Sequence, residues 1–345
     1  MGQSGAREQH SRRLSERKVP GRGGTVKGVG AVIFSALIAP LCAAALAQDY
    51  PARPVRLLIG FPPGGNVDVV GRILAQKMSE GFGHQVLPEN RTGAGSIIAN
   101  EHVAKSAPDG YTLLVVSGAF VTQAATMRKL PYDPVRDFSW ISTVVTYPLV
   151  LSVRSDSRFR TLDEFIGFAK SNPGKLHYPS PGMGTLYHLA GEMLVSMAGI
   201  DMQHVPFRGG SEPLTEVLSG RMELLIDALT NSYPHIQGGK FRPLAVSSLE
   251  RSPALPKVPT VAQSVPGYEA GSFLGIAGPA GLPGAIVERV NREMKRVLAL
   301  PDIGQRFAEW GGTPSPNSPE DMRRHVESEI AKWKRVVEER KIELP

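Results

Sequence analysis

The sequence predicts an α/β fold built from two units, and three observations support this prediction. Short segments of branched apolar residues alternate with segments whose apolar residues recur at helical spacing, a pattern typical of parallel sheets with helices on their faces. The 345 residues are 41% hydrophobic and 21% charged, which is enough apolar material for two domains. Glycine-rich loops join strands to helices in both units.

Residues 1–47 have the pattern of a secretory signal peptide. Basic residues precede an apolar run, which ends in Ala45-Leu46-Ala47 with small residues where a signal peptidase cleaves. We expect cleavage near Ala47 and a periplasmic product that begins at Gln48. A membrane anchor is the alternative, because the run approaches transmembrane length, but Pro40 and the alanine-rich end favour cleavage.

The excess positive charge lies in this N-terminal region. Seven of the 39 basic residues and two of the 32 acidic residues precede residue 48, so 32 basic and 30 acidic residues remain after cleavage. A nearly neutral chain without a basic tract is not expected to bind nucleic acid. The single cysteine, Cys42, is removed with the signal, so we expect no disulfide in the mature protein.

After the signal, strands and helices alternate in two series. The first series has expected strands at 55–59, 112–116 and 149–153 and expected helices at 67–78, 97–105 and 162–170. The second has expected strands at 176–178, 204–207, 222–227 and 243–246 and expected helices at 186–197 and 213–218. This alternation predicts parallel sheets in both units.

Two helices are expected near the C-terminus, at 286–298 and 319–340. Val326, Ile330, Trp333 and Val337 form one apolar stripe on the second helix, and such a stripe needs a partner surface. Acidic residues on the same helix argue against binding to anionic lipid. We therefore expect the stripe to pack on the first unit.

Three strand-to-helix loops, at 61–66, 180–185 and 207–211, are the candidate binding loops. Glycine lets the backbone approach a ligand closely, and the unpaired N–H groups and positive dipole end of a helix stabilise an anion. One such loop is equally well explained as a tight turn. Three loops at equivalent places favour a site between the two units, at the carboxyl ends of the strands.

Other kinds of site have little support. Gly60 and Gly65 have the spacing of a nucleotide phosphate loop, but Asn66 and Val67 stand where lysine and serine or threonine are required. The histidines of the mature chain lack paired metal-ligand spacing, and no Gly-x-Ser-x-Gly motif is present. We therefore expect neither a metal nor a cofactor.

Three ionisable residues have two interpretations each. Asp227 ends a strand shortly before Ser232, and it is either a buried acid bonded to the following loop or a ligand contact. His188 and Glu192 lie one helical turn apart, and we interpret them as a packing pair and not as a metal site.

Ordered motifs along the mature chain resemble those of the tripartite tricarboxylate transporter substrate-binding receptors, the Bug-type periplasmic solute-binding proteins. They are FPPGGNVD at 61–68, ENRTGAGS at 89–96, APDGYTLL at 107–114, LPYDPVRDF at 130–138, PGKLHYPSPGMGTLYHLAGE at 173–192, HVPFRGG at 204–210 and LPKVPTVAQ at 255–263. The resemblance extends from about residue 50 to about residue 342.

The resemblance implies a two-lobed periplasmic binding protein of the type II, Venus-flytrap kind, with a ligand cleft between the lobes. Residues 48–149 and 248–345 would form lobe I, and residues 150–247 would form lobe II. It also implies a monomeric, non-enzymatic receptor that captures a small organic acid and presents it to the permease subunits of a tripartite tricarboxylate transporter.

The resemblance also implies which residues hold the ligand. In such receptors main-chain amides, hydroxyls and bridging water hold the carboxylate, and amide dipoles can do so without an arginine. The candidate ligand residues are Phe61, Gly64, Gly65 and Asp68 in the first loop, Ser180, Gly182, Gly184 and Thr185 in the second, and Phe207, Asp227 and Ser232 beside them.

Two other functions stay open at this point. One is an exported α/β enzyme that acts on carboxylates, with Asp227 or His188 as its acid or base, although no nucleophile and base are paired in the sequence. The other is a periplasmic sensor that passes its ligand-bound state to a signalling partner. The identity of the carboxylate is also open.

Overall fold

A computed structural model describes residues 50–207 and 212–342. Its strands are β1 (Val55–Ile59), β2 (Val86–Asn90), β3 (Thr112–Ser117), β4 (Phe138–Arg154), β5 (Leu176–Ser180), β6 (Met202–Pro206), β7 (Leu225–Ala228), β8 (Phe241–Val246), β9 (Gly271–Pro279) and β10 (Thr313–Pro314). The predicted strand at 55–59 is β1, and the other predicted strands fall on β3 to β8 with shifted ends.

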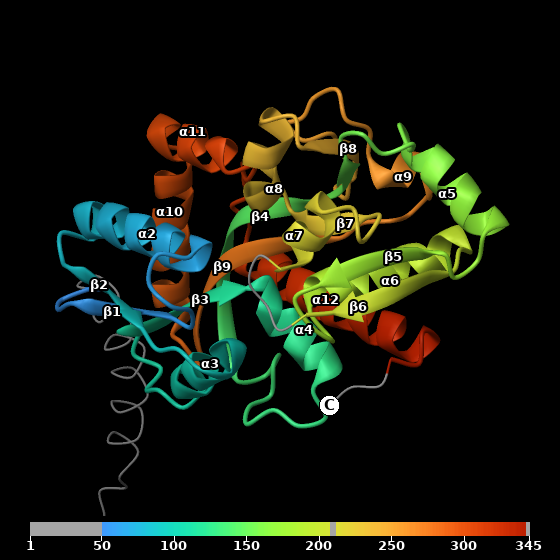
Figure 1. Ribbon diagram of the computed structural model, residues 1–345. Coiled ribbons are helices and arrows are strands. Elements are labelled where there is room, and N and C mark those ends of the chain that lie inside the picture. Colours follow the sequence, from blue (N-terminus) through green and yellow to red (C-terminus); the bar gives the residue numbers. More distant parts are fainter. Residues whose placement is uncertain (1–49, 208–211, 343–345) are drawn as a thin grey trace, which may run out of the picture. The chain divides into compact units, whose positions relative to one another are not determined.

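The helices alternate with these strands (Figure 1). They are α2 (Asn66–Phe82), η1 (Ala94–Ser96), α3 (Ile97–Ala104), α4 (Gly118–Thr126), α5 (Leu162–Ser171), α6 (Leu186–Ala198), α7 (Glu212–Leu218), α8 (Leu229–Gln237), α9 (Val261–Ser264), α10 (Gly284–Leu298), α11 (Pro301–Glu309) and α12 (Pro319–Glu339). The predicted signal peptide lies outside the described residues. Within the described part, no helix is both long and apolar enough to span a membrane.

The larger sheet is mixed and not parallel. β1 pairs in parallel with β2 and β3, but β9 pairs antiparallel with both β3 and β4. The small sheet of β5 and β6 is parallel. The prediction of parallel sheets is therefore right for β1 to β3 and for β5 and β6. It is wrong for the strands around β4, because the glycine-rich strand β9 inserts between β3 and β4.

β4 is one long strand with two sets of partners. Its residues up to Pro148 pair with β9, and its residues from Leu149 onward pair with β7 and β8. The segment 149–153, predicted as a separate strand, is the second part of β4. The change of partner falls at a proline, which has no N–H to donate to a neighbouring strand. The predicted lobe boundary lies at this point of the chain, and the division into lobes stays a prediction.

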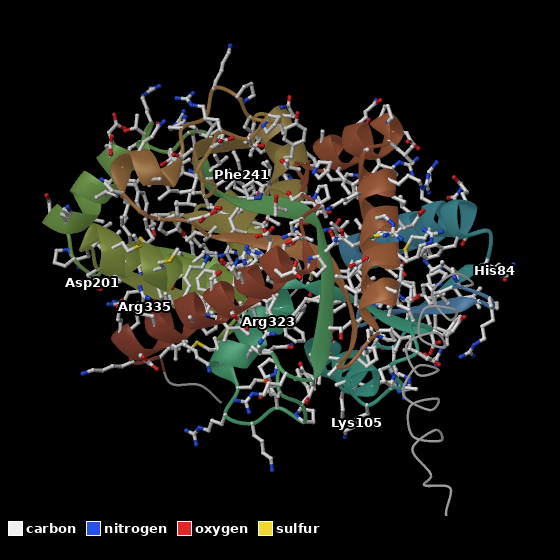
Figure 2. The ribbon with its side chains drawn as sticks, turned by 180° about the vertical axis from the view of Figure 1, so that it is seen from behind. His84, Lys105, Asp201, Phe241, Arg323 and Arg335 are labelled. Carbon is white, nitrogen blue, oxygen red and sulfur yellow. The ribbon has the colours of Figure 1, made fainter. Side chains whose placement is uncertain are left out.

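α12 buries its apolar stripe inside the protein. Three of the four stripe residues are buried, and Trp333 is fully buried. The helix packs on α4 and β4, and its end reaches α6, where Arg340 pairs with Glu192 at 2.7 Å. Figure 2 shows α12 from behind, with Arg323 and Arg335 labelled on it. The packing is confirmed, but the partner surface is wider than predicted because it includes α6 of the second series.

Candidate binding site

The loop between β1 and α2 is fixed by the carboxylate of Asp68. The N–H of Gly64 donates to this carboxylate at 2.8 Å, and Arg72 and Asn90 donate to it as well. Burial acts to raise the pKa of Asp68, but the hydrogen bonds from Arg72, Gly64 and Asn90 together hold it below its usual value. Asn90 also donates to the carbonyl of Phe61. These hydrogen bonds therefore fix the conformation of the loop that precedes α2.

The loop between β5 and α6 is held by its own hydroxyls and by one histidine. Gly182 and Gly184 have φ angles of 143° and 71°, which favour glycine. Thr185 Oγ1 donates to the carbonyl of Gly182 at 2.8 Å, and Ser180 Oγ contacts the backbone of the same residue. The N–H of Gly184 donates to Nδ1 of His188 at 3.0 Å. The first amides of α6 consequently receive no cap from Thr185.

α4 and α8 also begin directly after strands. The hydroxyl of Ser117, at the start of α4, is buried and has no hydrogen-bond partner in the part of the chain that the structure describes. At the start of α8, the carboxylate of Asp227 accepts hydrogen bonds from the N–H of Ala228 and from the side chains of Asn231 and Ser232. Burial raises the pKa of Asp227. These donors tie Asp227 to its own loop.

The starts of these four helices meet around one cavity of about 600 Å³. The lining residues at the helix starts are Asn66 and Val67 of α2, Ser117 and Ala119 of α4, Thr185, Leu186 and Tyr187 of α6, and Ala228, Thr230 and Asn231 of α8. A helix start has N–H groups without partners inside the helix and carries the positive end of the helix dipole, and four such starts lie at this cavity. Such an arrangement stabilises an anion without a basic side chain.

The described lining residues include no acidic, basic or histidine side chain. Tyr147 and Tyr187 are uncharged, because burial raises the pKa of both phenols, and Tyr147 donates to Asn66 Oδ1 at 3.3 Å. Met127 and Met183 supply apolar surface. The cavity therefore suits a ligand that has both an anionic group and an apolar body.

Three of the predicted ligand residues, Phe61, Gly184 and Thr185, line this cavity. The remaining ones belong to the loops behind it: Gly64, Gly65 and Asp68 at the start of α2, Ser180 and Gly182 before α6, and Asp227 and Ser232 at α8. Phe207 donates its N–H to the carbonyl of Ser180 at 2.8 Å. Residues 208–211, the rest of the third predicted loop, lie outside the described residues.

Sequence reasoning missed the contribution of α4 and of the strands β4 and β9. α4 brings Ser117, Thr122 and Gln123 to the cavity, and the strands bring Tyr147 and Ser272. A signal for α4 was available, because Ser117-Gly118 follows an apolar strand in the same way as the glycine-rich loops do. No comparable signal marks Tyr147 and Ser272, which come from the middle and the start of strands.

Neither candidate for acid–base chemistry lines the cavity. Asp227 is engaged by its own loop, and His188 is 2% exposed and accepts the Gly184 N–H. Among residues 50–207 and 212–342, no group of three His, Cys, Asp or Glu side chains is placed to hold a metal ion.

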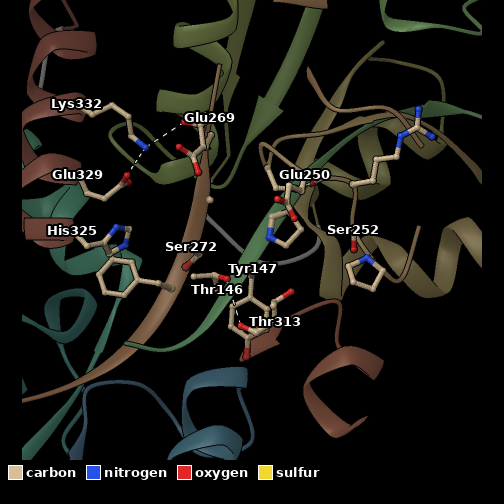
Figure 3. A pocket seen from close by; sticks show the side chains of 17 residues that line it. Thr146, Tyr147, Glu250, Ser252, Glu269, Ser272, Thr313, His325, Glu329 and Lys332 are labelled. Atoms are coloured by element: carbon tan, nitrogen blue, oxygen red, sulfur yellow. Dashed lines mark hydrogen bonds and ion pairs between the residues drawn. The ribbon is translucent and has the colours of Figure 1, made fainter. Parts of the chain in front are cut away.

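A second cavity, of about 300 Å³, shares Tyr147 and Ser272 with the first. α12 contributes His325, Glu329 and Lys332 to it (Figure 3). Lys332 pairs with Glu329, and Glu250, Arg251 and Glu269 also line this cavity, so it contains several charged side chains. The larger cavity is the better candidate site, because the helix starts and three predicted ligand residues meet there.

The chain is similar to known proteins in sequence and in structure. The family model described as tripartite tricarboxylate transporter family receptor matches residues 70–342. A Pseudomonas sp. (strain P51) protein, the UPF0065 protein in the tcbD-tcbE intergenic region, is 38% identical over 292 residues, which cover 84% of this chain and 87% of that one.

Two solved structures are also similar. R. palustris Rpa4515 with adipate is 34% identical with a TM-score of 0.74, and the match covers 86% of this chain and 100% of that chain. The periplasmic binding protein BugD is 30% identical with a TM-score of 0.69 and the same coverage. The predicted periplasmic binding protein fold is confirmed by these matches. The chain belongs to the receptor family of the tripartite tricarboxylate transporters, in its Bug-type branch.

Proposed function

We propose that this receptor works in the periplasm, binds a small organic carboxylate in the 600 Å³ cavity and delivers it to the permease subunits of a tripartite tricarboxylate transporter. One observation carries the proposal: four helices begin at a cavity whose described lining includes no charged side chain. Fixed amide dipoles can hold a carboxylate there in place of water. The adipate in the related R. palustris structure agrees with this ligand class.

We further propose that the ligand is shared between two lobes, residues 48–149 with 248–345 and residues 150–247, in a monomeric protein. The cavity is lined by α2 and α4 of the first segment and by α6 and α8 of the second, which supports this division. Closure of the lobes would bury the ligand. The ligand would stabilise the closed form by the difference between its affinities for the closed and open forms.

The proposal is tested by calorimetry on the mature protein with adipate, malate, citrate, glutamate and benzoate. Each acid that binds is compared with its neutral amide, which has a similar shape but no anionic charge. We expect the acid to bind and the amide to bind at least tenfold more weakly, because the helix dipoles favour the anion. Equal binding of acid and amide would contradict a carboxylate site.

Ala119, in the first turn of α4, offers a matched pair of variants. Ala119→Asp places a negative charge beside the ligand, whereas Ala119→Asn has nearly the same shape and no charge. Two like charges about 5 Å apart at an effective dielectric constant of about 20 repel by roughly 3 kcal/mol, so Ala119→Asp should bind about a hundredfold more weakly than Ala119→Asn. The fold should tolerate both, because aspartate and asparagine are both accepted near helix starts.

Delivery to a permease requires a cellular measurement. Cells that lack the gene for this chain should lose uptake of the labelled acid that binds best, and the intact gene should restore it. The Ala119→Asp gene should not restore uptake. Normal uptake in the deletion strain, with the purified protein still binding the acid, would favour a sensing role over transport.

A further inference from the structure

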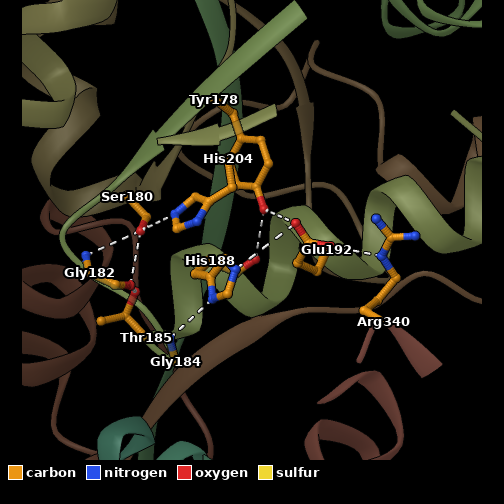
Figure 4. A network of polar contacts seen from close by, with 9 residues as sticks. All are labelled: Tyr178, Ser180, Gly182, Gly184, Thr185, His188, Glu192, His204 and Arg340. Carbon is orange, nitrogen blue, oxygen red and sulfur yellow. Dashed lines mark hydrogen bonds and ion pairs between the residues drawn. The ribbon is translucent and has the colours of Figure 1, made fainter. Parts of the chain in front are cut away.

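The loop that starts α6 is tied to two stacked histidines (Figure 4). The N–H of Gly184 donates to His188 Nδ1 at 3.0 Å, and Ser180 Oγ lies 2.6 Å from His204 Nε2. The two imidazole rings stack with their centroids 3.9 Å apart and their planes 26° apart. Ser180 and Gly184, at the two ends of the loop, are therefore both hydrogen-bonded to this pair of rings.

The hydrogen bond from Gly184 defines the protonation state of His188. An N–H donor needs a lone pair on Nδ1, so the ring is neutral and carries its proton on Nε2. Burial lowers the pKa of His188, and Glu192, whose Oε1 lies 4.0 Å from Nε2, acts in the opposite direction. Burial, followed by the neighbouring His188, lowers the pKa of His204 to about 3. Both rings are consequently neutral at pH 7.

Glu192 has stronger partners than His188. The Tyr178 hydroxyl of β5 donates to Glu192 Oε1 at 2.7 Å, and Arg340, which follows α12, donates to Oε2 at 2.7 Å. The packing pair of His188 and Glu192 predicted from the sequence is only a 4.0 Å contact. Among the described residues, His204 also faces His188, because the two rings are stacked. Glu192 lies on the Nε2 side of the ring, so it does not compete with the Gly184 N–H for Nδ1.

We propose that His188 is a positioning residue of the ligand site: its neutral ring holds the Gly184 N–H, sets the turn that directs the first amides of α6 into the cavity, and loosens the ligand when it becomes protonated. The inference rests on the proposed carboxylate function. Gly184, Thr185 and Leu186 all line the cavity, whereas His188 does not.

The pH dependence has a definite sign. Protonation would put a hydrogen on Nδ1, so the ring would no longer accept the Gly184 N–H and the two N–H groups would face each other. Because burial lowers the pKa of His188, the hydrogen bond is intact at neutral pH and is lost as the pH falls below the ordinary histidine range. Ligand affinity should fall with it.

Two variants of His188 separate positioning from packing. His188→Leu has a side chain of similar bulk but no acceptor, and we expect its affinity for the tightest acid of the calorimetric panel to fall at least tenfold. His188→Asn places an amide oxygen near the position of Nδ1 and should recover most of that loss. His325→Leu, on α12 and outside the 600 Å³ cavity, controls for the replacement of a half-buried histidine by leucine and should bind normally.

The pH readout compares the wild type with His188→Asn between pH 7.5 and pH 4.5. Titration of the ligand affects both proteins equally, so it cancels in the ratio of their Kd values. We expect the wild type to lose affinity relative to His188→Asn as the pH falls, because the amide does not titrate. A ratio that stays constant with pH overturns the inference, and this comparison does not require the leucine variant to fold.

The outcomes also distinguish this inference from the proposed function. If the wild type binds an acid and a folded His188→Leu protein, verified by circular dichroism, binds it equally well, the positioning role is wrong and the carboxylate function stands. If the wild type binds none of the five acids, the proposed function fails, and the positioning role fails with it.

Discussion

At the scale of single residues, the two glycines at the helix starts differ although the sequence makes them look equivalent. Gly184 has a φ of 71°, and a Cβ added there would lie 3.3 Å from the side chain of Thr126. Gly65 has a φ of −77°, and its nearest neighbour would be the carbonyl of Pro62 at 3.7 Å. Of these two positions, only that of Gly184 has a backbone conformation that requires glycine.

We expect Gly184→Ala to lower the free energy of unfolding by about 1–2 kcal/mol, because a side chain disfavours the left-handed conformation. Gly65→Ala should cost less, about 0.5 kcal/mol, because its φ is ordinary and space is available, and the remaining cost is that alanine is a poorer N-cap of α2 than glycine. Urea unfolding of both variants measures the difference. Equal stability of the two variants would contradict the left-handed turn at Gly184.

At the scale of elements, the sequence predicts segments in which local pattern and burial agree. β1 and α2 follow this rule, because branched apolar residues precede a clear helical stripe. α4 and α8 were not predicted. α4 begins with glycine and contains valine and threonine, and α8 contains asparagine, serine and an internal Pro234, all of which have low helix propensity. Tertiary packing, and not local propensity, stabilises these two helices. Two of the four helices that begin at the cavity were therefore not predicted.

The strand β9 escaped prediction for a related reason. Its sequence, GSFLGIAGP, contains three glycines, and glycine weakens a strand locally. A Cβ on Gly275 would lie 2.4 Å from the side chain of Met322, and one on Gly278 would lie 2.5 Å from Leu282. At Gly275 the neighbours are Met322 of α12 and the Ser142 carbonyl of β4, 3.0 Å away, and contacts with such distant segments cannot be known from neighbours in sequence.

α12 provides a stability prediction for an element. Trp333→Ala should lower the free energy of unfolding by about 3–5 kcal/mol, because it removes the largest fully buried side chain and leaves a cavity. Arg335→Ala, on the exposed side of the same helix, should change it by less than about 0.5 kcal/mol. Thermal and urea unfolding provide the comparison. A small loss for Trp333→Ala would mean that α12 is not anchored through its stripe.

At the scale of the whole molecule, the expected processing site gives a direct test. Mass spectrometry of the protein recovered from the periplasm of its producing cells should give a mature N-terminus at or near Gln48. Tyr50, two residues after the expected start, is held in the fold by its hydroxyl, which donates to the carbonyl of Gly110 at 2.6 Å. Recovery of the full-length chain from the membrane fraction would contradict cleavage.

The described lining of the cavity includes no charged side chain, and this has a consequence for the rate at which the receptor captures its ligand. Helix dipoles act over roughly one turn, and the mature chain has 32 basic and 30 acidic residues, so little long-range attraction is available to steer an anion. In stopped-flow measurements, the association rate constant should change by less than about threefold between 20 and 300 mM salt, where electrostatic steering would change it by tenfold or more. Capture would then be set by random encounter, and uptake would be insensitive to the ionic strength of the surroundings.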